Sequence, residues 1–218
     1  MNEDLEPHPL DALVYGGGGH GKMVIEILRG MAKYRIAGLI DDGLTPGTSV
    51  AGVPVLGGSE RLAELHASGI HTAFNAVAGV GNIATRVTVF ERLLKAGFAL
   101  PALAHPAAYV EATAHLADGA QLFAHSYAGS DAQIGFGVIL SIGVCVPHDC
   151  VIGEYTNISP GTMLAGMVTT GPRVLIGMNA TINIGLRIGD GARIGNGATI
   201  KKDVPAGTRV RAGHIWPE

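Results

Sequence analysis

The spacing of hydrophobic and polar positions changes near the middle of the chain. From position 110 onward an aliphatic residue returns at every sixth place, and a small or apolar residue follows it four places later. A six-residue period matches neither the turn of a helix nor the alternation of a strand. It is typical of short flat strands joined by corners, three of which close a triangular coil of about 18 residues. The aliphatic series is Val110, Leu116, Leu122, Ala128, Ile134, Leu140, Val146, Ile152, Ile158, Leu164, Thr170, Ile176, Ile182, Ile188, Ile194 and Ile200, and only Thr170 is polar.

This repeat predicts a parallel β-helix over residues 105–212, with the aliphatic side chains filling its interior. Glycine often follows the aliphatic residue directly, as in Ile134-Gly135 and Ile188-Gly189. We expect these glycines to adopt corner conformations that a side chain would forbid. The same register turns Val146 and Cys150 inward, so His148 and Asp149 fall at an outward-facing corner.

The N-terminal part of the chain alternates between short apolar runs and segments with helical spacing. Such alternation predicts a Rossmann-like α/β domain with a parallel sheet. We therefore expect two domains, residues 1–104 and residues 105–218. Strands are predicted at Ala12–Tyr15, Ile36–Ile40 and Thr72–Val77, and helices at Met23–Leu28, Ser59–His66 and Asn82–Ala96. The last helix has Asn82 as its cap and Gly97 as its stop signal.

A glycine-rich loop follows the first predicted strand. The run Gly16-Gly17-Gly18-Gly19-His20-Gly21-Lys22 contains the G-x-G-x-x-G spacing of dinucleotide-binding loops. Glycines let backbone N–H groups approach a phosphate, and the N-terminus of the following helix favours its negative charge. Along the sequence, Asp41 follows the glycine loop at about the separation expected for an acidic residue that binds ribose. A flexible turn is the alternative, and a domain of this size suits a mononucleotide-sized ligand.

Composition narrows the class of protein and of partners. The formal net charge is −3, which gives no basic footprint for nucleic acid. The first six residues lack the basic and apolar stretch of a secretory signal, and no apolar run approaches the length of a membrane span. Two cysteines, Cys145 and Cys150, are too few for a disulfide framework. We expect a cytoplasmic protein without nucleic-acid or membrane partners.

The glycine loop, the Asp41-Asp42 pair and the six-residue repeats, in this order, resemble the nucleotide-sugar acyltransferases of the hexapeptide-repeat family. Members include bacillosamine-pathway and perosamine N-acetyltransferases and sialic acid O-acyltransferase relatives. The resemblance spans about residues 11–212 and implies a left-handed β-helix, a homotrimer, and acetyl-CoA bound between neighbouring protomers. It also implies that the first domain holds the sugar nucleotide, with Arg86 near the ligand loop at 78–82. The implied sugar-nucleotide residues are Gly16, Gly18, Gly19, His20, Gly21, Lys22, Asp41, Asp42 and Asn82.

By the same resemblance His148 is a general base and Asp149 its supporting carboxylate. Acetyl transfer to an amine needs a base that takes a proton, and histidine suits this near neutral pH. Gly166 lies one coil further on, where its N–H can bind the thioester oxygen as charge develops. Asn157 stands where the family commonly has a second histidine, which leaves its contact with the acyl donor open. The role of Trp216, which departs from the family's usual ending, is also open.

The leading hypothesis is therefore an acetyl-CoA-dependent N-acetyltransferase acting on a nucleotide-linked amino sugar, without a metal. O-acetylation of a sugar hydroxyl would use the same base and donor. A metal-dependent hydratase of the gamma-type carbonic anhydrase kind needs a close histidine pair that the β-helix sequence does not contain. A non-catalytic nucleotide-sugar sensor would bind the nucleotide but not coenzyme A.

Overall fold

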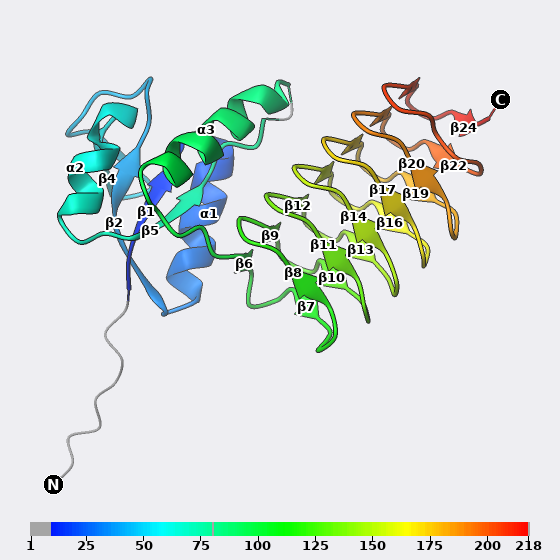
Figure 1. The fold of residues 1–218 in the computed structure, drawn as a ribbon, viewed down its shortest axis with the longest axis horizontal. Helices are drawn as coiled ribbons and strands as arrows, with labels where there is room; N and C mark the ends of the chain where they lie inside the picture. The colour runs from blue at the N-terminus through cyan, green and yellow to red at the C-terminus, as the bar shows by residue number, and fades with distance from the viewer. Residues whose placement is uncertain (1–9, 80, 218) are drawn as a thin grey trace, which may run out of the picture. The chain divides into compact units, whose positions relative to one another are not determined.

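The structure is a computed structural model that describes residues 10–79 and 81–217 (Figure 1). The chain forms two compact units: residues up to 77 with 88–100, and residues 78–87 with 101 onward. Segment 78–87, expected in the first domain, thus groups with the β-helix, because the side chain of Arg86 is buried there and donates to the carbonyl oxygen of Tyr155. In the described part of the chain no helix is long and apolar enough to cross a membrane.

The first unit is built on a sheet with the strand order β3-β4-β2-β1-β5. Its parallel strands are β1 (Leu10–Tyr15), β2 (Tyr34–Ile40), β4 (Val53–Gly57) and β5 (Thr72–Asn75), and β3 (Ser49–Val50) pairs antiparallel with β4. The helices are α1 (Gly19–Gly30), α2 (Leu62–Ala67) after a short 3₁₀ turn η1 (Ser59–Arg61), and α3 (Ile83–Lys95). The predicted strands and helices are confirmed within a few residues. The β3–β4 hairpin was not predicted.

Parallel pairing brings the carboxyl ends of the four long strands to one edge of this sheet. Tyr15 ends β1 and Ile40 ends β2, and both are buried together with most of their strands. The glycine loop follows β1 and Asp41-Asp42 follows β2, so both predicted ligand segments start from this edge. Such an edge is where open α/β sheets bind their ligands.

The second unit is a left-handed parallel β-helix whose two-residue strands stack into three faces (Figure 1). The first face contains β7 (Tyr109–Val110), β10 (Tyr127–Ala128), β13 (Cys145–Val146), β16 (Met163–Leu164), β19 (Thr181–Ile182), β22 (Thr199–Ile200) and β24 (Ile215–Trp216). The second face contains β8 (His115–Leu116), β11 (Gln133–Ile134), β14 (Val151–Ile152), β17 (Thr169–Thr170) and β20 (Arg187–Ile188). The third face contains β6 (Leu103–Ala104), β9 (Gln121–Leu122), β12 (Ile139–Leu140), β15 (Asn157–Ile158), β18 (Leu175–Ile176), β21 (Arg193–Ile194) and β23 (Arg209–Val210).

The interior of the β-helix is the aliphatic series that the repeat predicted. Ile134, Leu140 and Ile158, for example, have no exposed surface. Thr170 is also buried, and its hydroxyl accepts a hydrogen bond of 3.0 Å from the backbone N–H of Gly153, which satisfies the polar atom. At the C-terminal end Trp216 packs against this core, and its indole N–H donates to the carbonyl oxygen of Asp203 at 3.0 Å.

The glycines that directly follow the aliphatic residues do not have the special backbone conformation that we expected of them. Gly135 and Gly177, which follow the aliphatic residues, do not have positive φ. A Cβ atom at Gly135 would lie 2.7 Å from the carbonyl oxygen of Ile152, and one at Gly177 would lie 2.6 Å from the backbone nitrogen of Asn196. These glycines are therefore required by the close approach of neighbouring coils. Left-handed backbone is used at other corner positions, including Gly143 and Gly197.

Candidate active site

His148 and Asp149 stand together on the corner between β13 and β14, where the first face turns into the second. Val146 and Cys150 on either side of them are fully buried, so the predicted outward orientation of the pair is confirmed. Each of the two side chains is 56% exposed, and His148 Nδ1 lies 2.8 Å from Asp149 Oδ2. Asp149 has φ +59°, a left-handed conformation that Asp tolerates better than most residues. Its backbone N–H donates to the carbonyl oxygen of Ser130 on the preceding coil at 3.0 Å, which fixes the corner.

The hydrogen bond between these side chains determines which imidazole nitrogen is available for catalysis. An ionised carboxylate only accepts hydrogen bonds, so Nδ1 of a neutral His148 carries the hydrogen. Nε2 then keeps its lone pair and can take a proton. The carboxylate also stabilises the imidazolium that this transfer forms. The corner therefore has the geometry of an oriented general base.

Gly166 lies under the ring of His148, as the repeat of about one coil predicted. A Cβ atom at position 166 would lie 2.5 Å from both Cε1 and Nε2 of His148, so only glycine leaves room for the ring. The neighbouring N–H groups of Ala165 and Met167 donate to carbonyl oxygens of Ile182 and His148. The N–H of Gly166 has no hydrogen-bond acceptor among the described residues. It is thus an unused donor on the residue that lies under the imidazole ring.

Cys150 does not compete with His148 as a reactive group. Its side chain is fully buried and its thiol donates to the carbonyl oxygen of Ala165 at 3.4 Å. Burial raises the pKa of the Cys150 thiol, which lowers its thiolate fraction. The structure confirms that Cys150 points into the prism.

Asn157 is not brought to the same corner. It lies in β15 on the third face and is only 5% exposed. In a triangular coil the third face is opposite the edge between the first and second faces, so within one chain Asn157 and His148 point apart. The predicted contact of Asn157 with the acyl donor stays a prediction.

The glycine loop of the first unit is fixed by sterics. Gly16 has φ +118°, and a Cβ atom at Gly21 would collide with the carbonyl oxygen of Gly16. Gly18 precedes α1 as its N-cap, and the first turn of α1 contains no acidic residue. A Cβ atom at Gly18 or Gly19 would meet nothing within 4 Å, so this side of the loop is open. The N-terminus of α1 is thereby suited to an anion, with Lys22 and His20 in its first turn.

Asp41 and Asp42 hold the loops at the carboxyl edge of the sheet. Asp41 accepts the N–H groups of Gly17 and Gly43 at 2.7 and 2.9 Å. Asp42 accepts the backbone N–H of Ser59 at 2.7 Å on one oxygen, and on the other it accepts the Tyr15 hydroxyl at 2.8 Å and the Arg92 guanidinium at 2.6 Å. Although burial raises the pKa of Asp42, these donors outweigh it and lower the pKa to about 2. The Asp41 and Asp42 carboxylates therefore hold the loops at this edge of the sheet in place.

The comparisons with known proteins agree with this geometry. Residues 11–93 match the model of the PglD N-terminal domain. The chain is 31% identical over 174 residues to a GDP-perosamine N-acetyltransferase of Escherichia coli O157:H7, covering 78% of this chain and 76% of that one. The chain belongs to the nucleotide-sugar acetyltransferases.

Solved structures extend the similarity of this acetyltransferase to both units. PerB from Caulobacter crescentus, in complex with CoA and GDP-perosamine, is 30% identical with a TM-score of 0.86, over 92% of this chain and 93% of that one. The acetyltransferase domain of PglB from Neisseria gonorrhoeae, in complex with acetyl coenzyme A, is 32% identical with a TM-score of 0.85, over 93% and 96% of the two chains. The family and the fold predicted from the sequence are confirmed.

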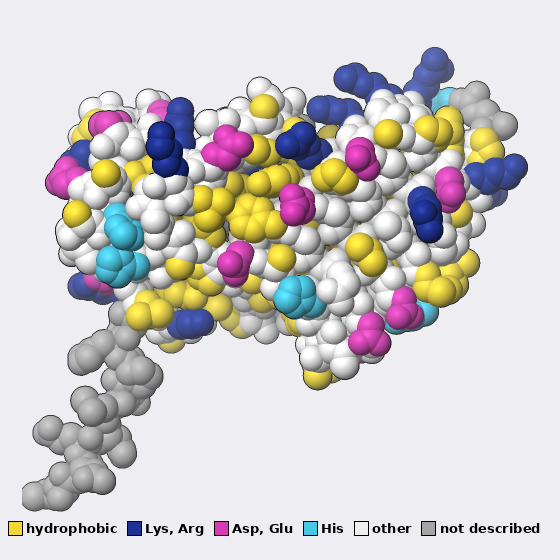
Figure 2. All heavy atoms as spheres, viewed as in Figure 1, with side chains coloured by type: hydrophobic (Ala, Val, Ile, Leu, Met, Phe, Trp, Pro, Cys, Tyr) yellow, Lys and Arg dark blue, Asp and Glu magenta, His cyan; other side chains and the backbone are white. Residues whose placement is uncertain are grey.

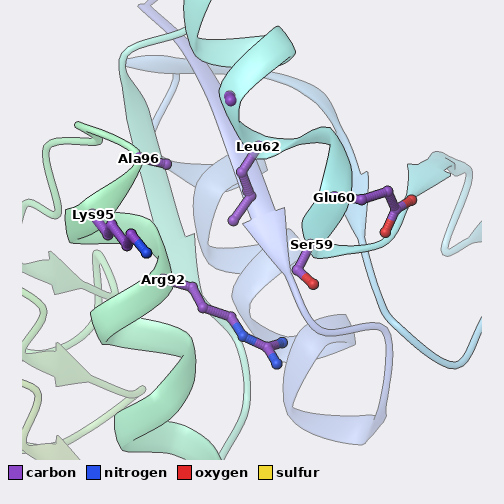
Figure 3. Close-up of a pocket in the computed structure, with 7 residues that line it drawn as sticks. Ser59, Glu60, Leu62, Arg92, Lys95 and Ala96 are labelled. Atoms are coloured by element: carbon purple, nitrogen blue, oxygen red, sulfur yellow. The ribbon is translucent and has the colours of Figure 1, made fainter.

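A pocket of about 400 Å³ in the first unit of the acetyltransferase lies beside Asp42 (Figure 3). Figure 3 shows Arg92 reaching from α3 toward Ser59 of η1, and these are two of the groups that Asp42 holds. Sequence reasoning missed Arg92, because an arginine on a predicted helix gives no sign of a tertiary partner fifty residues away. The lining residues are Ser59, Glu60, Leu62, Ala63, Arg92, Lys95 and Ala96.

Asn82 and Arg86 both have a structural task in the acetyltransferase. Asn82 Oδ1 accepts the backbone N–H of Ala84 at 3.0 Å, the helix-capping role weighed above, and Val80 of the same loop lies outside the described residues. Arg86 is 1% exposed, and burial lowers the pKa of its guanidinium to about 10. Its bond to Tyr155 joins the start of α3 to the coil that carries His148.

Metal-ligating side chains do not gather in the described residues. No three His, Cys, Asp or Glu side chains there could hold an ion together. Each unit thus carries its own candidate groups: the second unit has the histidine corner with Gly166, and the first unit has the loops at the carboxyl edge of its sheet.

Proposed function

We propose that this acetyltransferase transfers the acetyl group of acetyl-CoA directly to the amine of a nucleotide-linked amino sugar, with His148 as general base. The observation that carries the proposal is the corner itself: an imidazole oriented by Asp149 at 2.8 Å, seated on Gly166, whose N–H is unoccupied in the described part of the chain. The relatives supply the class of donor and acceptor, since PerB is solved with CoA and GDP-perosamine. Use of acetyl-CoA also favours the cytoplasm as the place of reaction.

The reaction follows from the positions of these groups. The amine nitrogen attacks the thioester carbonyl carbon, and Nε2 of His148 takes the proton that the nitrogen must lose. The carbonyl oxygen gains negative charge, which the N–H of Gly166 stabilises. When the tetrahedral centre collapses, the carbon–sulfur bond breaks, and the coenzyme A thiolate takes from the imidazolium the proton that came from the amine. No acyl-enzyme forms, because the thioester is already activated.

The sugar nucleotide is expected at the glycine loop, where Gly18, Gly19, His20 and Lys22 surround the N-terminus of α1. The proposed residues for binding the sugar nucleotide also include Asp41, Asp42 and Asn82. The side chains of these three residues are held in place by the hydrogen bonds described for the candidate active site. Asn157 lies on the third face and is only 5% exposed, so its contact with the donor is not part of the argument for His148. The homotrimer with active sites between protomers is proposed on the family resemblance alone.

The experiment is a panel of UDP-, GDP- and CMP-linked amino sugars incubated with acetyl-CoA and followed by mass spectrometry. We expect one acceptor to gain a single acetyl group on nitrogen. His148→Ala should lower kcat by about 10²- to 10⁴-fold. His115→Ala, which removes an exposed histidine from the second face, should leave kcat unchanged. Acetylation of a hydroxyl instead would establish O-transfer, and no product with any acceptor would refute the proposal.

A further inference from the structure

Two histidine side chains of the first unit meet at its surface. His71 Nδ1 lies 3.1 Å from His66 Nε2, and the two ring centroids are 4.6 Å apart. His71 directly precedes β5, so the pair stands at the amino end of this parallel strand, whereas the glycine loop and Asp41 start from the carboxyl edge of the sheet. Figure 2 shows adjacent histidine side chains (cyan) on the surface of this unit. The pair is therefore separate from the loops described for the candidate active site.

The backbone at both histidines is fixed by hydrogen bonds. His66 lies in the last turn of α2, and its carbonyl oxygen accepts the N–H of Gly69 at 3.1 Å. The carbonyl oxygen of His71 accepts the N–H of Ala99 at 2.8 Å. Because neither backbone segment has to be ordered when a ligand binds, the two imidazoles form a preorganised pair.

The surroundings leave the facing nitrogens accessible. The half-buried ring of His66 packs edge-to-face on Phe98, with centroids 5.2 Å apart, and the ring of His71 is exposed. A Cβ atom at Gly97 would lie 3.1 Å from His66 Nε2, so glycine keeps the space beside this nitrogen clear. Within the described part of the chain, no carboxylate forms an ion pair with either imidazole.

The distance between the two nitrogens suits a single metal ion. Imidazole nitrogens lie about 2.0–2.1 Å from Zn²⁺, so two of them on one tetrahedral ion are about 3.3 Å apart. The observed separation of 3.1 Å therefore needs to open by only about 0.2 Å. In the neutral pair without an ion, one of these nitrogens carries a hydrogen that the other accepts. Moving that hydrogen to the far nitrogen of the same ring offers both lone pairs to the ion and leaves the net charge of the pair unchanged.

We propose that His66 and His71 together bind one divalent ion of the class of Zn²⁺, Ni²⁺ and Cu²⁺. Imidazole is a preferred ligand of these ions, whereas Mg²⁺ and Ca²⁺ prefer oxygen ligands. No third His, Cys, Asp or Glu side chain joins the pair among the described residues, so water completes the coordination. The bound ion connects the end of α2 to the start of β5 and thereby stabilises the folded first unit.

The test titrates the full chain with ZnCl₂ or NiCl₂ in a calorimeter, and MgCl₂ serves as the comparison ion. The variants His66→Gln and His71→Gln each leave a single imidazole at the site. The matched control is His115→Gln, which removes an exposed histidine from the second unit. Because His71 is exposed, His71→Gln should fold normally and keeps the test decisive if the loss of the His66 ring from Phe98 disturbs folding.

We expect the native protein and His115→Gln to bind one Zn²⁺ or Ni²⁺ ion that His66→Gln and His71→Gln bind about tenfold or more weakly, because the second imidazole acts at a high effective concentration. Mg²⁺ should not bind there. At about 100 times the dissociation constant, Ni²⁺ should raise the melting temperature of the native protein by about 5 °C, and it should raise that of His71→Gln much less. Absence of Zn²⁺ and Ni²⁺ binding, or equal affinity of the native protein and His71→Gln, would overturn the proposal. No acetyl donor or acceptor is present, so the result is independent of the proposed function.

Discussion

Replacing Gly166 by alanine tests whether His148, the proposed general base, needs the open space beneath its imidazole ring. The new Cβ atom would lie 2.5 Å from Cε1 and Nε2 of His148, whereas ordinary van der Waals contact begins at 3.4 Å, so the ring must move by about 0.9 Å. The half-exposed ring can swing outward, but this movement breaks its 2.8 Å hydrogen bond to Asp149. A misplacement of about 1 Å in a reacting group lowers the rate about 100-fold. That factor corresponds to about 3 kcal/mol in the activation barrier.

The assay is kcat/KM for acetyl transfer, measured for Gly166→Ala, His148→Ala and the double variant. Stability should change little, because Gly166 does not have a positive φ and the displaced ring is solvent-exposed. In the His148→Ala background the alanine at 166 meets no ring, so it should have almost no further effect. If Gly166→Ala lowered kcat/KM equally in the native protein and in His148→Ala, the proposed contact between position 166 and the ring would be refuted. Retention of most of the activity by Gly166→Ala alone would refute it as well.

The other predictions concern the remaining contacts. Asp149→Asn should lower kcat about 10³-fold at unchanged melting temperature, because an amide can donate to Nδ1 and favour the wrong tautomer; Asp149→Glu should restore part of the rate. Gly21→Ala should lower the free energy of unfolding by several kcal/mol in urea titrations, since its Cβ meets the Gly16 carbonyl, whereas Gly19→Ala, with open space, should not. Burial lowers the pKa of Arg86 from 12.5 to about 10, which corresponds to a desolvation cost of about 3 kcal/mol for the charged form. Because Arg86→Met removes this cost and still fills the space, its free energy of unfolding should stay within about 1 kcal/mol of the native value. Arg86→Ala leaves a cavity and should be at least about 2 kcal/mol less stable than Arg86→Met. The pKa of Asp42 is lowered from 3.8 to about 2, so its contribution is complete above pH 4 and is lost as the pH falls toward 2; Asp42→Asn should remove that part of the acid-unfolding curve followed by circular dichroism.

The β-helix and its histidine corner could be predicted because the repeat is a strict local code. Each aliphatic residue must point inward, so burying Val146 and Cys150 forces His148 and Asp149 outward without any knowledge of distant contacts. A coil of constant length then places Gly166 under His148, which the close approach of the two residues confirms. In the first unit, the G-x-G-x-x-G spacing predicted a glycine loop between a strand and a helix, and the loop lies between β1 and α1.

The features that could not be predicted depend on partners far apart in the chain. Arg92 and Arg86 stand on one helix with ordinary helical spacing, yet one joins Asp42 and the other is buried against Tyr155. Nothing in the local pattern distinguishes these arginines from solvated ones. The glycines that follow the aliphatic residues illustrate a second limit, since the sequence predicted a special backbone conformation for them, whereas the contact between coils that requires them is visible only in three dimensions.

The stacking of the coils also explains how such a narrow fold can serve a long substrate. Neighbouring coils lie about 4.8 Å apart, so residues one coil apart, such as His148 and Gly166, lie next to each other on the surface. A straight prism, however, shows a ligand one edge or one face at a time. His148 is on the edge between the first and second faces, so the third face of the same chain lies opposite to it.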